Sequence, residues 1–433
     1  MSNESPEPGS GVPPDGQPTS PGDPQQPKAT GPPTLSAWFQ HFIGTTGGNV
    51  SLVAAGLVIA FAAGWLVNAT TGDTSQLTTS SAPTVTTAPT AESPDGEEPT
   101  VEELPSATEP TSPAAAVPAP AQLPSGTVPK APIPQFTCPA ATVEVDDSNG
   151  LTSALRNAKP GDVIHLKDGT YQNDREFTAS AKATADKPIY LCGGRGAVLQ
   201  GEGYKADYVL HFLNAAHWRV DGFTVRFGQK GVMVDTGVGL GLQNLLVQDI
   251  GDEAVHLRKN STDNVVRGLT IRNTGNRRDK FGEGVYVGTA VSNWPNITNG
   301  QPDHSDRNFV LDNTISATTS EAVDIKEGTS GGVVAGNTFD GSALSGADSW
   351  VDIKGNGWLI AGNHGRTAPK DGFQTHVILP GWGNANVFTL NTADLAGGTG
   401  VGYYLHEQLS NKVDCNNKAT GAAGGLSNDP CSG

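Results

Sequence analysis

Basic side chains are scarce in this 433-residue sequence, which has 27 lysines and arginines against 44 aspartates and glutamates and a formal net charge of −17. Such a chain is repelled by the phosphates of nucleic acids and by anionic membrane surfaces. Both are therefore excluded as general partners. A local basic groove is still compatible with this balance.

Cysteine is also rare, and no close Cys-x-x-Cys pair exists, which argues against a cysteine metal site. The four cysteines are Cys138, Cys192, Cys415 and Cys431. An even number of cysteines is typical of disulfides in an oxidising compartment. Nearness in the chain favours Cys138 with Cys192 and Cys415 with Cys431, but the sequence alone leaves the other pairings open.

Long apolar runs are limited to one uncharged stretch of 18 residues, 50–67. We expect a transmembrane helix over 49–68. A cleaved signal peptide is the alternative, with "VNA" at 67–69 as a loose cleavage site, but a basic n-region is lacking. The anchor hypothesis makes 1–48 a disordered cytoplasmic segment and 69–134 an acidic Pro/Thr/Ser-rich stalk, and it places the rest of the chain outside the cell membrane.

Helical periodicity is nearly absent after residue 135. It occurs in "NGLTSALRNAKPGD", residues 149–162, where Leu151 and Leu155 share one helical face and Pro160 ends it. Many short strands follow. One short helix before them is expected to cap the strand domain.

Two short phrases recur through 135–433 about every 22 to 30 residues. One includes "NFVLDNTIS" and "GVVAGNTFDG", and the other includes "AVHLR", "AVDIK" and "WVDIK". Interleaved strands at this period predict a solenoid, specifically an all-β right-handed parallel β-helix. A β-propeller is excluded because each blade needs about 40 residues or more. A stacked asparagine ladder is expected at one turn, from Asn273, Asn313, Asn337, Asn363 and Asn391.

The second phrase separates an inner from an outer face, because residues two apart share one side of a strand. Val232, Val255, Val285, Val323 and Val351 should point into the core. The outward positions are Met233, His256, Tyr286, Asp324, Asp352, His376 and Tyr404, followed by Asp235, Arg258, Gly288, Lys326, Lys354, Ile378 and His406.

These outward side chains allow two interpretations. One is a solvated face on which opposite charges pair; the other is a groove for an acidic polymer that contains proton-transfer groups. The groove hypothesis makes Lys326, Lys354, Arg258, His256 and Tyr286 candidate catalytic residues. It makes Asp324, Asp352, Trp350, His376 and Tyr404 candidate substrate-binding residues, with Trp350 expected to stack on a sugar ring.

Three carboxylates, Glu253, Glu283 and Glu321, stand two residues before the inward valines of successive coils. Stacked carboxylates repel one another unless protons or a cation intervene, so a hard cation such as calcium is expected. A regular strand would point these side chains inward, so we expect a bend there.

The phrases "LTSALRNAKPGDVIHLKDGTY", "ADKPIYLCGGRGAVLQGEG" and "EAVDIKEGTSGGVVAGNTF" resemble polysaccharide lyase family 6, which includes chondroitinase B and alginate lyases. In that family calcium neutralises a uronate carboxylate, a lysine abstracts the C5 proton and an arginine assists the leaving group. The resemblance implies Glu321 as a metal ligand, Lys326 as the base and Glu283 in place of an asparagine ligand. The family's second glutamate falls near Thr319 and its arginine near Lys354, where this chain departs from the pattern.

The function expected from these features is binding, and metal-assisted β-eliminating cleavage, of an acidic polysaccharide or cell-wall glycan by a membrane-anchored domain. Lys326 is expected to have a lowered pKa because it is crowded by other cations. Two alternatives are a non-catalytic surface carbohydrate-binding protein and a glycoside hydrolase that uses Asp324 and Asp352.

Overall fold

The computed structural model describes residues 124–433. The predicted segments 1–48 and 49–68, and most of the predicted stalk, lie outside this range. Within it, no helix combines the length and the apolar character needed to cross a bilayer.

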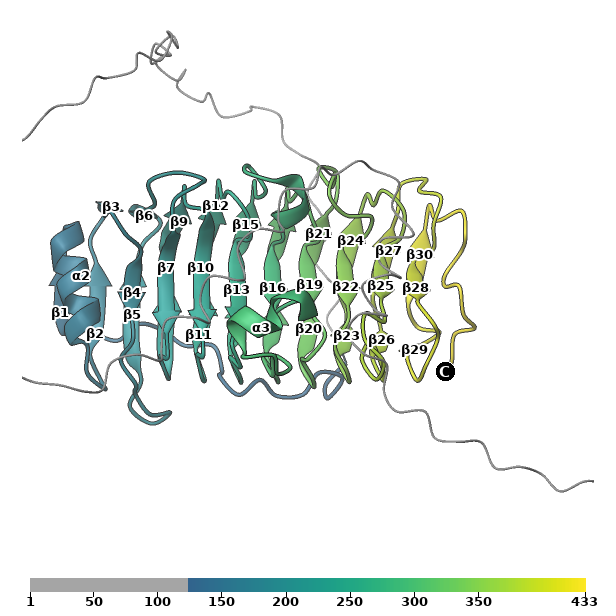
Figure 1. Cartoon of the computed structure of the whole chain (residues 1–433), viewed down its shortest axis with the longest axis horizontal. Helices are drawn as coiled ribbons and strands as arrows, with labels where there is room; N and C mark the ends of the chain where they lie inside the picture. Colours follow the sequence, from purple (N-terminus) through teal and green to yellow (C-terminus); the bar gives the residue numbers. More distant parts are fainter. Residues whose placement is uncertain (1–123) are drawn as a thin grey trace, which may run out of the picture. The chain divides into compact units, whose positions relative to one another are not determined.

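The described chain winds into a right-handed parallel β-helix with three sheets, and nearly all of its strands are parallel neighbours from successive coils (Figure 1). Sheet A contains β1 (Val143–Val145), β2 (Val163–Leu166), β5 (Ile189–Gly193), β8 (Trp218–Asp221), β11 (Gly241–Gln243), β14 (Val265–Arg267), β17 (Phe309–Leu311), β20 (Val333–Ala335), β23 (Leu359–Ala361), β26 (Val387–Thr389) and β29 (Lys412–Val413).

Sheet B contains β3 (Gly169–Gln172), β6 (Ala197–Gln200), β9 (Thr224–Arg226), β12 (Leu246–Gln248), β15 (Thr270–Arg272), β18 (Thr314–Ser316), β21 (Thr338–Asp340), β24 (His364–Arg366), β27 (Thr392–Asp394) and β30 (Lys418–Thr420). Sheet C contains β4 (Phe177–Ala179), β7 (Tyr208–Leu213), β10 (Lys230–Asp235), β13 (Val255–Arg258), β16 (Val285–Val287), β19 (Val323–Ile325), β22 (Val351–Ile353), β25 (Phe373–Thr375) and β28 (Tyr403–Leu405).

Helix α2 (Ser148–Asn157) lies at the N-terminal end of the solenoid (Figure 1). It begins after Asp147, whose side chain accepts a hydrogen bond from the Gly150 amide, as expected of an N-cap. Its buried residues Leu151 and Leu155 pack into the core. The disulfides Cys138–Cys192 and Cys415–Cys431 confirm the pairing that nearness favours.

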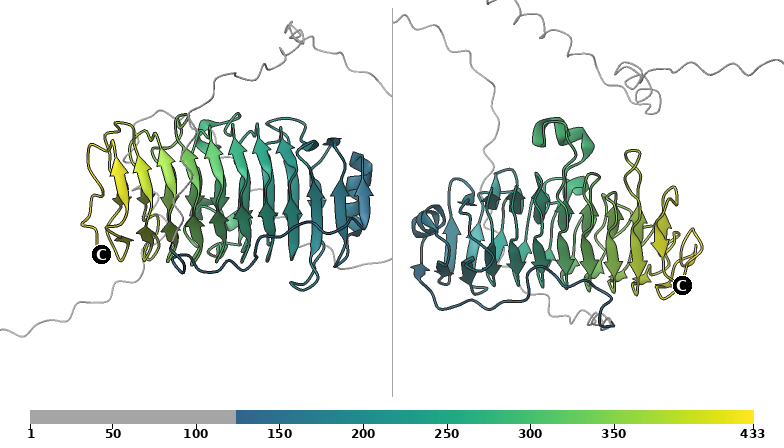
Figure 2. Two further views of the ribbon diagram at one scale, coloured as in Figure 1. Left: turned by 180° about the vertical axis from the view of Figure 1, so that it is seen from behind. Right: turned by 90° about the horizontal axis from the view of Figure 1, so that it is seen from below.

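Residues 124–136 lie along the outer face of sheet A, and Figure 2 shows this dark blue segment outside the solenoid. Ile133 is buried among the outward side chains of Val265, Phe309 and Val333. Gln243 fixes the segment by donating from Nε2 to the Phe136 carbonyl at 2.8 Å. The packed part of the chain therefore begins before residue 135.

The inward columns are confirmed, because every valine from Val232 to Val351 in the repeated phrase is fully buried in one continuous core. The outward columns are less open to solvent than expected. Met233 is fully buried, and Asp324 and Asp352 are 1% and 4% exposed. Coils about 4.8 Å apart bring these side chains against those of adjacent rungs.

Asparagine side chains stack as predicted at one turn, with one correction. The amide nitrogens of Asn313, Asn337 and Asn363 each donate to the side-chain oxygen of the next asparagine at 2.9 Å, and the ladder continues through Asn391. Asn273 is not part of the ladder, because Asn273 follows a strand of sheet B, β15, whereas each ladder residue precedes a strand of sheet B. The rung below Asn313 is occupied by Leu269.

Candidate active site

A cleft of about 500 Å³ lies on the outer face of sheet C. Its floor carries side chains from β10, β13 and β16, together with residues beside β19. The lining residues are Lys230, Glu253, His256, Arg258, Arg278, Lys280, Phe281, Glu283, Tyr286, Thr289, Ala290, Ser292, Asn293, Ile297 and Lys326.

Two insertions flanking β16 form the walls of the cleft. The first includes η1 (Asp279–Phe281) and precedes β16; the second includes η2 (Val291–Asn293) and α3 (Trp294–Ile297) and follows it. The insertions lengthen this part of the repeat: Val232 and Val255 are paired 23 residues apart, whereas Val255 and Val285 are 30 apart. Figure 1 shows α3 beside the strands of sheet C at the middle of the solenoid.

Hydrogen bonds brace both walls. Asp303 is fully buried and accepts from the Lys259 amide at 2.9 Å, the Asn260 amide at 2.8 Å and Thr289 Oγ1 at 2.7 Å. On the other wall, Thr319 Oγ1 donates to the Asp279 carbonyl at 2.8 Å. Carboxylate hydrogen bonds to backbone amides are strong, so the cleft is shaped before a ligand enters.

A chain of ion pairs continues from the cleft along sheet C. Lys326 Nζ lies 2.5 Å from Asp324 Oδ2, and Lys354 Nζ lies 2.7 Å from both Asp324 Oδ1 and Asp352 Oδ2. His376 Nδ1 is 2.7 Å from Asp352 Oδ1. The two Val-Asp-Ile-Lys phrases are thus adjacent rungs whose charges compensate one another, and Lys326 reaches the cleft whereas Lys354 does not line it.

The expectation of a lowered pKa for Lys326 is wrong in this structure. Burial lowers the pKa of Lys326, but the carboxylates of Asp324, Glu321 and Asp352 outweigh burial and raise it above the ordinary lysine value. The same balance of burial against Asp324 and Asp352 raises the pKa of Lys354. Both side chains therefore rest as ammonium ions.

Three carboxylates converge beside these lysines. Oxygen atoms of Glu283, Glu321 and Asp324 lie within 4.8 Å of one another. Burial and the charges of Glu253, Asp324 and Glu321 raise the pKa of Glu283 well above its usual range. Glu283 Oε2 is buried and has no hydrogen-bond partner among residues 124–433.

This donor set fits a hard cation. Carboxylate oxygens are the ligands that calcium prefers, and the partnerless oxygen of Glu283 is the group that such an ion would satisfy. The predicted third ligand, Glu253, is not part of the cluster. It forms an ion pair with Lys230 and lies 3.5 Å from His256 Nδ1.

His256 and Tyr286 stand on adjacent rungs with ring centroids 4.3 Å apart. His256 Nε2 donates to the Gly288 carbonyl at 2.9 Å, and burial lowers the pKa of His256, so the imidazole is neutral. Burial, with the charges of Asp324 and Glu283, raises the pKa of Tyr286 well above 10, so the phenol keeps its proton. Lys326 Nζ lies 4.9 Å from the Tyr286 ring centre.

Of the residues predicted from sequence, the cleft brings together Lys326, His256, Tyr286, Arg258 and the glutamates Glu253 and Glu283. Arg258 is held by Asp235, at 2.7 Å, and by the Tyr208 hydroxyl. His376 and Tyr404 lie further along sheet C, outside the cleft lining; Lys370 Nζ is 5.3 Å from the Tyr404 ring centre.

Trp350 must be corrected, because it cannot stack on a sugar. Its side chain is fully buried in the core, where its Nε1 donates to the Thr367 carbonyl at 3.0 Å. The strand begins at Val351, and the chain bends immediately before it, so the alternation of faces does not extend to residue 350.

Sequence reasoning missed the wall residues Arg278, Lys280 and Phe281. The signal was available in "NRRDKF", residues 276–281, a basic and aromatic stretch at a place where the repeat is longer than its neighbours. Phe281 is 40% exposed, and the Arg278 guanidinium lies 3.7 Å from its ring centre.

The chain is similar to several solved structures. An alginate lyase from Paenibacillus sp. str. FPU-7 is 33% identical, with 67% of this chain and 99% of that chain covered and a TM-score of 0.63. Pectate lyase Pel9A is 16% identical over 65% and 75% of the two chains, with a TM-score of 0.44. The PL6 family alginate lyase AlyGC is 18% identical over 61% and 40%, with a TM-score of 0.35.

No protein-family model and no curated protein sequence matches the chain.

Proposed function

Because this chain belongs to the family of the Paenibacillus alginate lyase, we propose that its cleft binds a uronate-containing polysaccharide and cleaves it by β-elimination. The observation that carries the proposal is the set of five basic side chains that line the cleft, those of Lys230, Arg258, Arg278, Lys280 and Lys326. Four of them are held by ion pairs with Glu253, Asp235, Asp252 and Asp324, and Lys280 forms no ion pair within residues 124–433.

These basic side chains gather in one cleft of a chain whose net charge is −17. Ammonium and guanidinium groups that carboxylates hold in place can donate charge-assisted hydrogen bonds to a uronate carboxylate that enters the cleft. A solvated face of paired charges would not need braced walls. The groove interpretation of the outward residues is therefore the better supported one.

In β-elimination the C5–H and C4–O bonds break, a C4–C5 double bond forms, and the leaving oxygen gains a proton. The reaction needs a base, a proton donor and positive charge near the uronate carboxylate. We assign the C5 proton to Lys326 Nζ and the proton for the leaving oxygen to the Tyr286 hydroxyl. A calcium ion held by Glu283, Glu321 and Asp324 would supply positive charge beside the uronate carboxylate.

Lys326 rests as an ammonium ion, so its amine must lose a proton before it can accept one. Because Lys326 lines the cleft, its proton can leave to the water that fills the cleft before the substrate enters. Tyr286 is suited to donate because its raised pKa keeps the phenol protonated. Arg258, fixed by Asp235, is positioned to hold the carboxylate of a neighbouring sugar.

The hydrolase alternative is less well supported. Glycosidases need one protonated carboxyl group, but Asp324 and Asp352 share Lys354 between them. Burial raises the pKa of Asp352, yet Lys354 and His376 lower it below its ordinary value, so it holds no proton to give. A carbohydrate-binding protein without activity would use the same cleft, and only the formation of unsaturated product distinguishes a lyase from it.

Incubation of the full chain with alginate, pectate and chondroitin in calcium tests this proposal. Unsaturated uronate ends should appear as new ultraviolet absorbance, and Lys326→Ala should remove it. Lys412→Ala, which alters a half-exposed lysine far from the cleft, is the matched control and should leave the rate unchanged. Absence of unsaturated product from every polymer, with binding retained, would identify a non-catalytic carbohydrate-binding protein.

We further propose that residues 49–68 anchor the chain in the cell membrane with the β-helix outside the cytoplasm. The two disulfides support an oxidising compartment. Membrane fractionation provides the test: the full chain should sediment with membranes, and a chain lacking 49–68 should not. Equal distribution of the two chains would contradict the anchor.

A further inference from the structure

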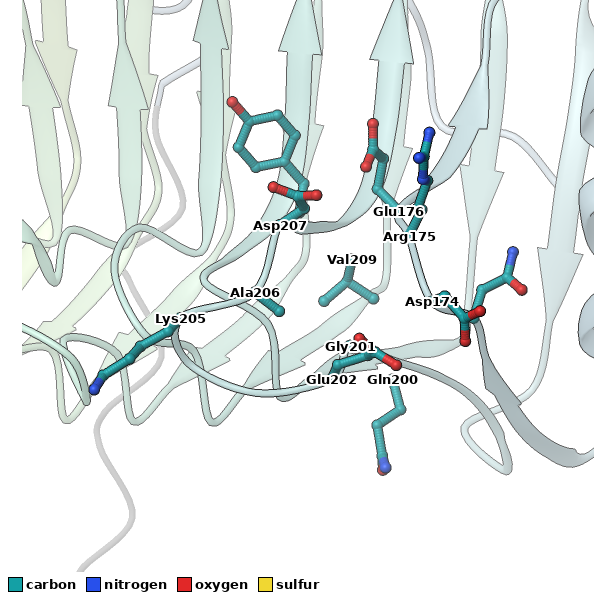
Figure 3. Close-up of a pocket in the computed structure, with 12 residues that line it drawn as sticks. Asp174, Arg175, Glu176, Gln200, Gly201, Glu202, Lys205, Ala206, Asp207 and Val209 are labelled. Atoms are coloured by element: carbon teal, nitrogen blue, oxygen red, sulfur yellow. The ribbon is translucent and has the colours of Figure 1, made fainter. Parts of the chain in front are cut away.

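Outside the cleft, the described residues form a second hollow of about 250 Å³ beside β4 and β7 (Figure 3). Three of its carboxylates, those of Asp174, Glu202 and Asp207, are exposed. Exposed carboxylates stay hydrated and need no partner, so this hollow gives no sign of a ligand. A pair of histidines at the opposite end of sheet C does.

His376 and His406 occupy the same position on adjacent rungs of sheet C. His376 follows β25 and His406 follows β28, and the two strands are paired through Thr375 and Leu405. The His406 amide donates to the Thr375 carbonyl at 3.3 Å, so the ladder continues as far as the histidines. Because Thr375 and Leu405 are buried, the alternation of faces places both imidazoles on the outer face of the sheet.

The separation of the two imidazole rings fits a shared metal ion. Their centres are 5.5 Å apart, and the ring planes are inclined by 33°. Two imidazoles bound to one tetrahedral zinc ion, with Zn–N bonds of about 2.1 Å, have ring centres roughly 5 Å apart. The observed separation is therefore close to the one that a shared ion requires.

A carboxylate orients the ring of His376. Its Nδ1 donates to Asp352 Oδ1 at 2.7 Å, and the other oxygen of Asp352 is held by Lys354 at 2.7 Å. This hydrogen bond places the proton of the neutral ring on Nδ1 and leaves the lone pair on Nε2, which has no hydrogen-bond partner among residues 124–433. Histidines that bind metals usually donate from their other ring nitrogen to such a carboxylate.

His406 has a similar arrangement on the next rung. Its Nδ1 is buried, lacks a hydrogen-bond partner within the described part of the chain, and faces Glu407 Oε1 at 4.0 Å. The side chain as a whole is 38% exposed, so the ring edge that includes Nε2 is the part open to solvent. The side chain of His376 is 32% exposed, and an ion in solution can therefore reach both rings.

The charges around the pair are compatible with a cation. Lys354 lies one rung before His376, but its ammonium is held between Asp324 and Asp352 at 2.7 Å from each. It therefore adds no uncompensated positive charge. The carboxylate of Glu407 brings a negative charge beside His406.

We propose that His376 and His406 bind a divalent transition-metal ion such as zinc through their two Nε2 atoms. Imidazole nitrogens favour such ions, whereas the carboxylate oxygens of Glu283, Glu321 and Asp324 favour calcium. The bound ion joins the last two rungs of sheet C, and water fills its remaining coordination positions. The inference does not rest on the proposed function, because neither histidine lines the cleft.

Calorimetric titration of the full chain with zinc chloride tests this proposal, with calcium in excess to fill the carboxylate site of the cleft. One zinc ion should bind per chain. His376→Gln and His406→Gln should each weaken binding at least about tenfold, because each removes one of the two protein ligands. His304→Gln is the matched control and should leave the affinity unchanged, because His304 is a 56% exposed side chain in the connection before β17.

The absence of zinc binding overturns the site, and so does equal weakening by His304→Gln. Zinc binding that Glu283→Gln abolishes and the two histidine variants leave intact also overturns it, because the ion would then lie in the cleft.

Cobalt(II) in place of zinc gives a second measurement, since its visible absorption reports its ligands. The side chain of His406 forms no hydrogen bond within residues 124–433, so His406→Gln removes a ligand without removing a contact that holds the fold. The absorption should appear with the wild type and be lost in His406→Gln, and an unchanged spectrum overturns the assignment. Activity on uronate polymers does not enter either measurement, so failure of the lyase proposal leaves this site standing.

Discussion

Replacing Lys354 with methionine tests the buried ion network that joins the two Val-Asp-Ile-Lys copies. The side chain of Lys354 is 9% exposed, and its Nζ contacts Asp324 and Asp352 at 2.7 Å each. Removal of one partner from a buried ion pair costs about 3–5 kcal/mol, because the remaining charge is left without compensation.

The cost here should fall at the lower end of that range. Asp324 keeps Lys326 at 2.5 Å, and Asp352 keeps His376 at 2.7 Å. We therefore expect a loss of about 3 kcal/mol in the free energy of unfolding. With about 2.1 cal/mol/K of unfolding entropy per residue over the 310 described residues (433 − 124 + 1), this corresponds to a fall in Tm of roughly 5 °C.

Differential scanning calorimetry at neutral pH measures the change. Lys167→Met is the matched control, because Lys167 and Glu144 are 3.0 Å apart but 51% and 61% exposed, and such surface pairs contribute at most about 1 kcal/mol. Adding Asp352→Asn to Lys354→Met should recover part of the loss. An unchanged Tm for Lys354→Met, or no recovery in the double variant, would refute the electrostatic explanation.

Three further variants probe other parts of the site. Calcium at 100 times its Kd should stabilise the folded wild type by about 2.7 kcal/mol, which raises its Tm by roughly 4 °C. Calcium should not raise the Tm of Glu283→Gln, and equal shifts in the two chains would place the ion elsewhere. The hydrogen bond to Asp352 raises the pKa of His376 in the folded chain above 6.5. The stabilisation that this pair gives is therefore complete below the pKa of His376 in the unfolded chain, and it is lost as the pH rises through the pKa of His376 in the folded chain. The Tm difference between the wild type and His376→Gln should therefore shrink from about pH 6 upward, and a constant difference would contradict the assignment. Asp303→Asn should cost roughly 3 kcal/mol and speed hydrogen exchange in 289–305; unchanged exchange would mean that this wall is held by other contacts.

Periodicity in the sequence was sufficient for the solenoid and its core. Val323 and Val351 mark inward positions because a strand alternates sides strictly, and the structure places both in the core. The same rule failed at Trp350, where the strand has not yet begun. Local alternation predicts the face of a residue only within the strand, and short strands of three residues leave many positions outside it.

The candidate site could be located from sequence more readily than it could be described. Lys326 and Tyr286 share the outer face of sheet C, as the repeat predicted. The raised pKa of Lys326 depends on its distances to three carboxylates on two adjacent rungs, which a pattern does not supply. Phe281 and the walls come from insertions, which interrupt the repeat and so carry no periodic signal.

The central claim is that the cleft performs β-elimination on a uronate, and carboxyl reduction of the substrate tests it most directly. Reduction converts each uronate carboxylate into a hydroxymethyl group and leaves the glycosidic linkages in place. The rate of formation of unsaturated ends should be measurable on the untreated polymer that the chain cleaves best and absent on its carboxyl-reduced form. Cleavage of the reduced polymer, with saturated ends, would contradict the account and indicate a hydrolase.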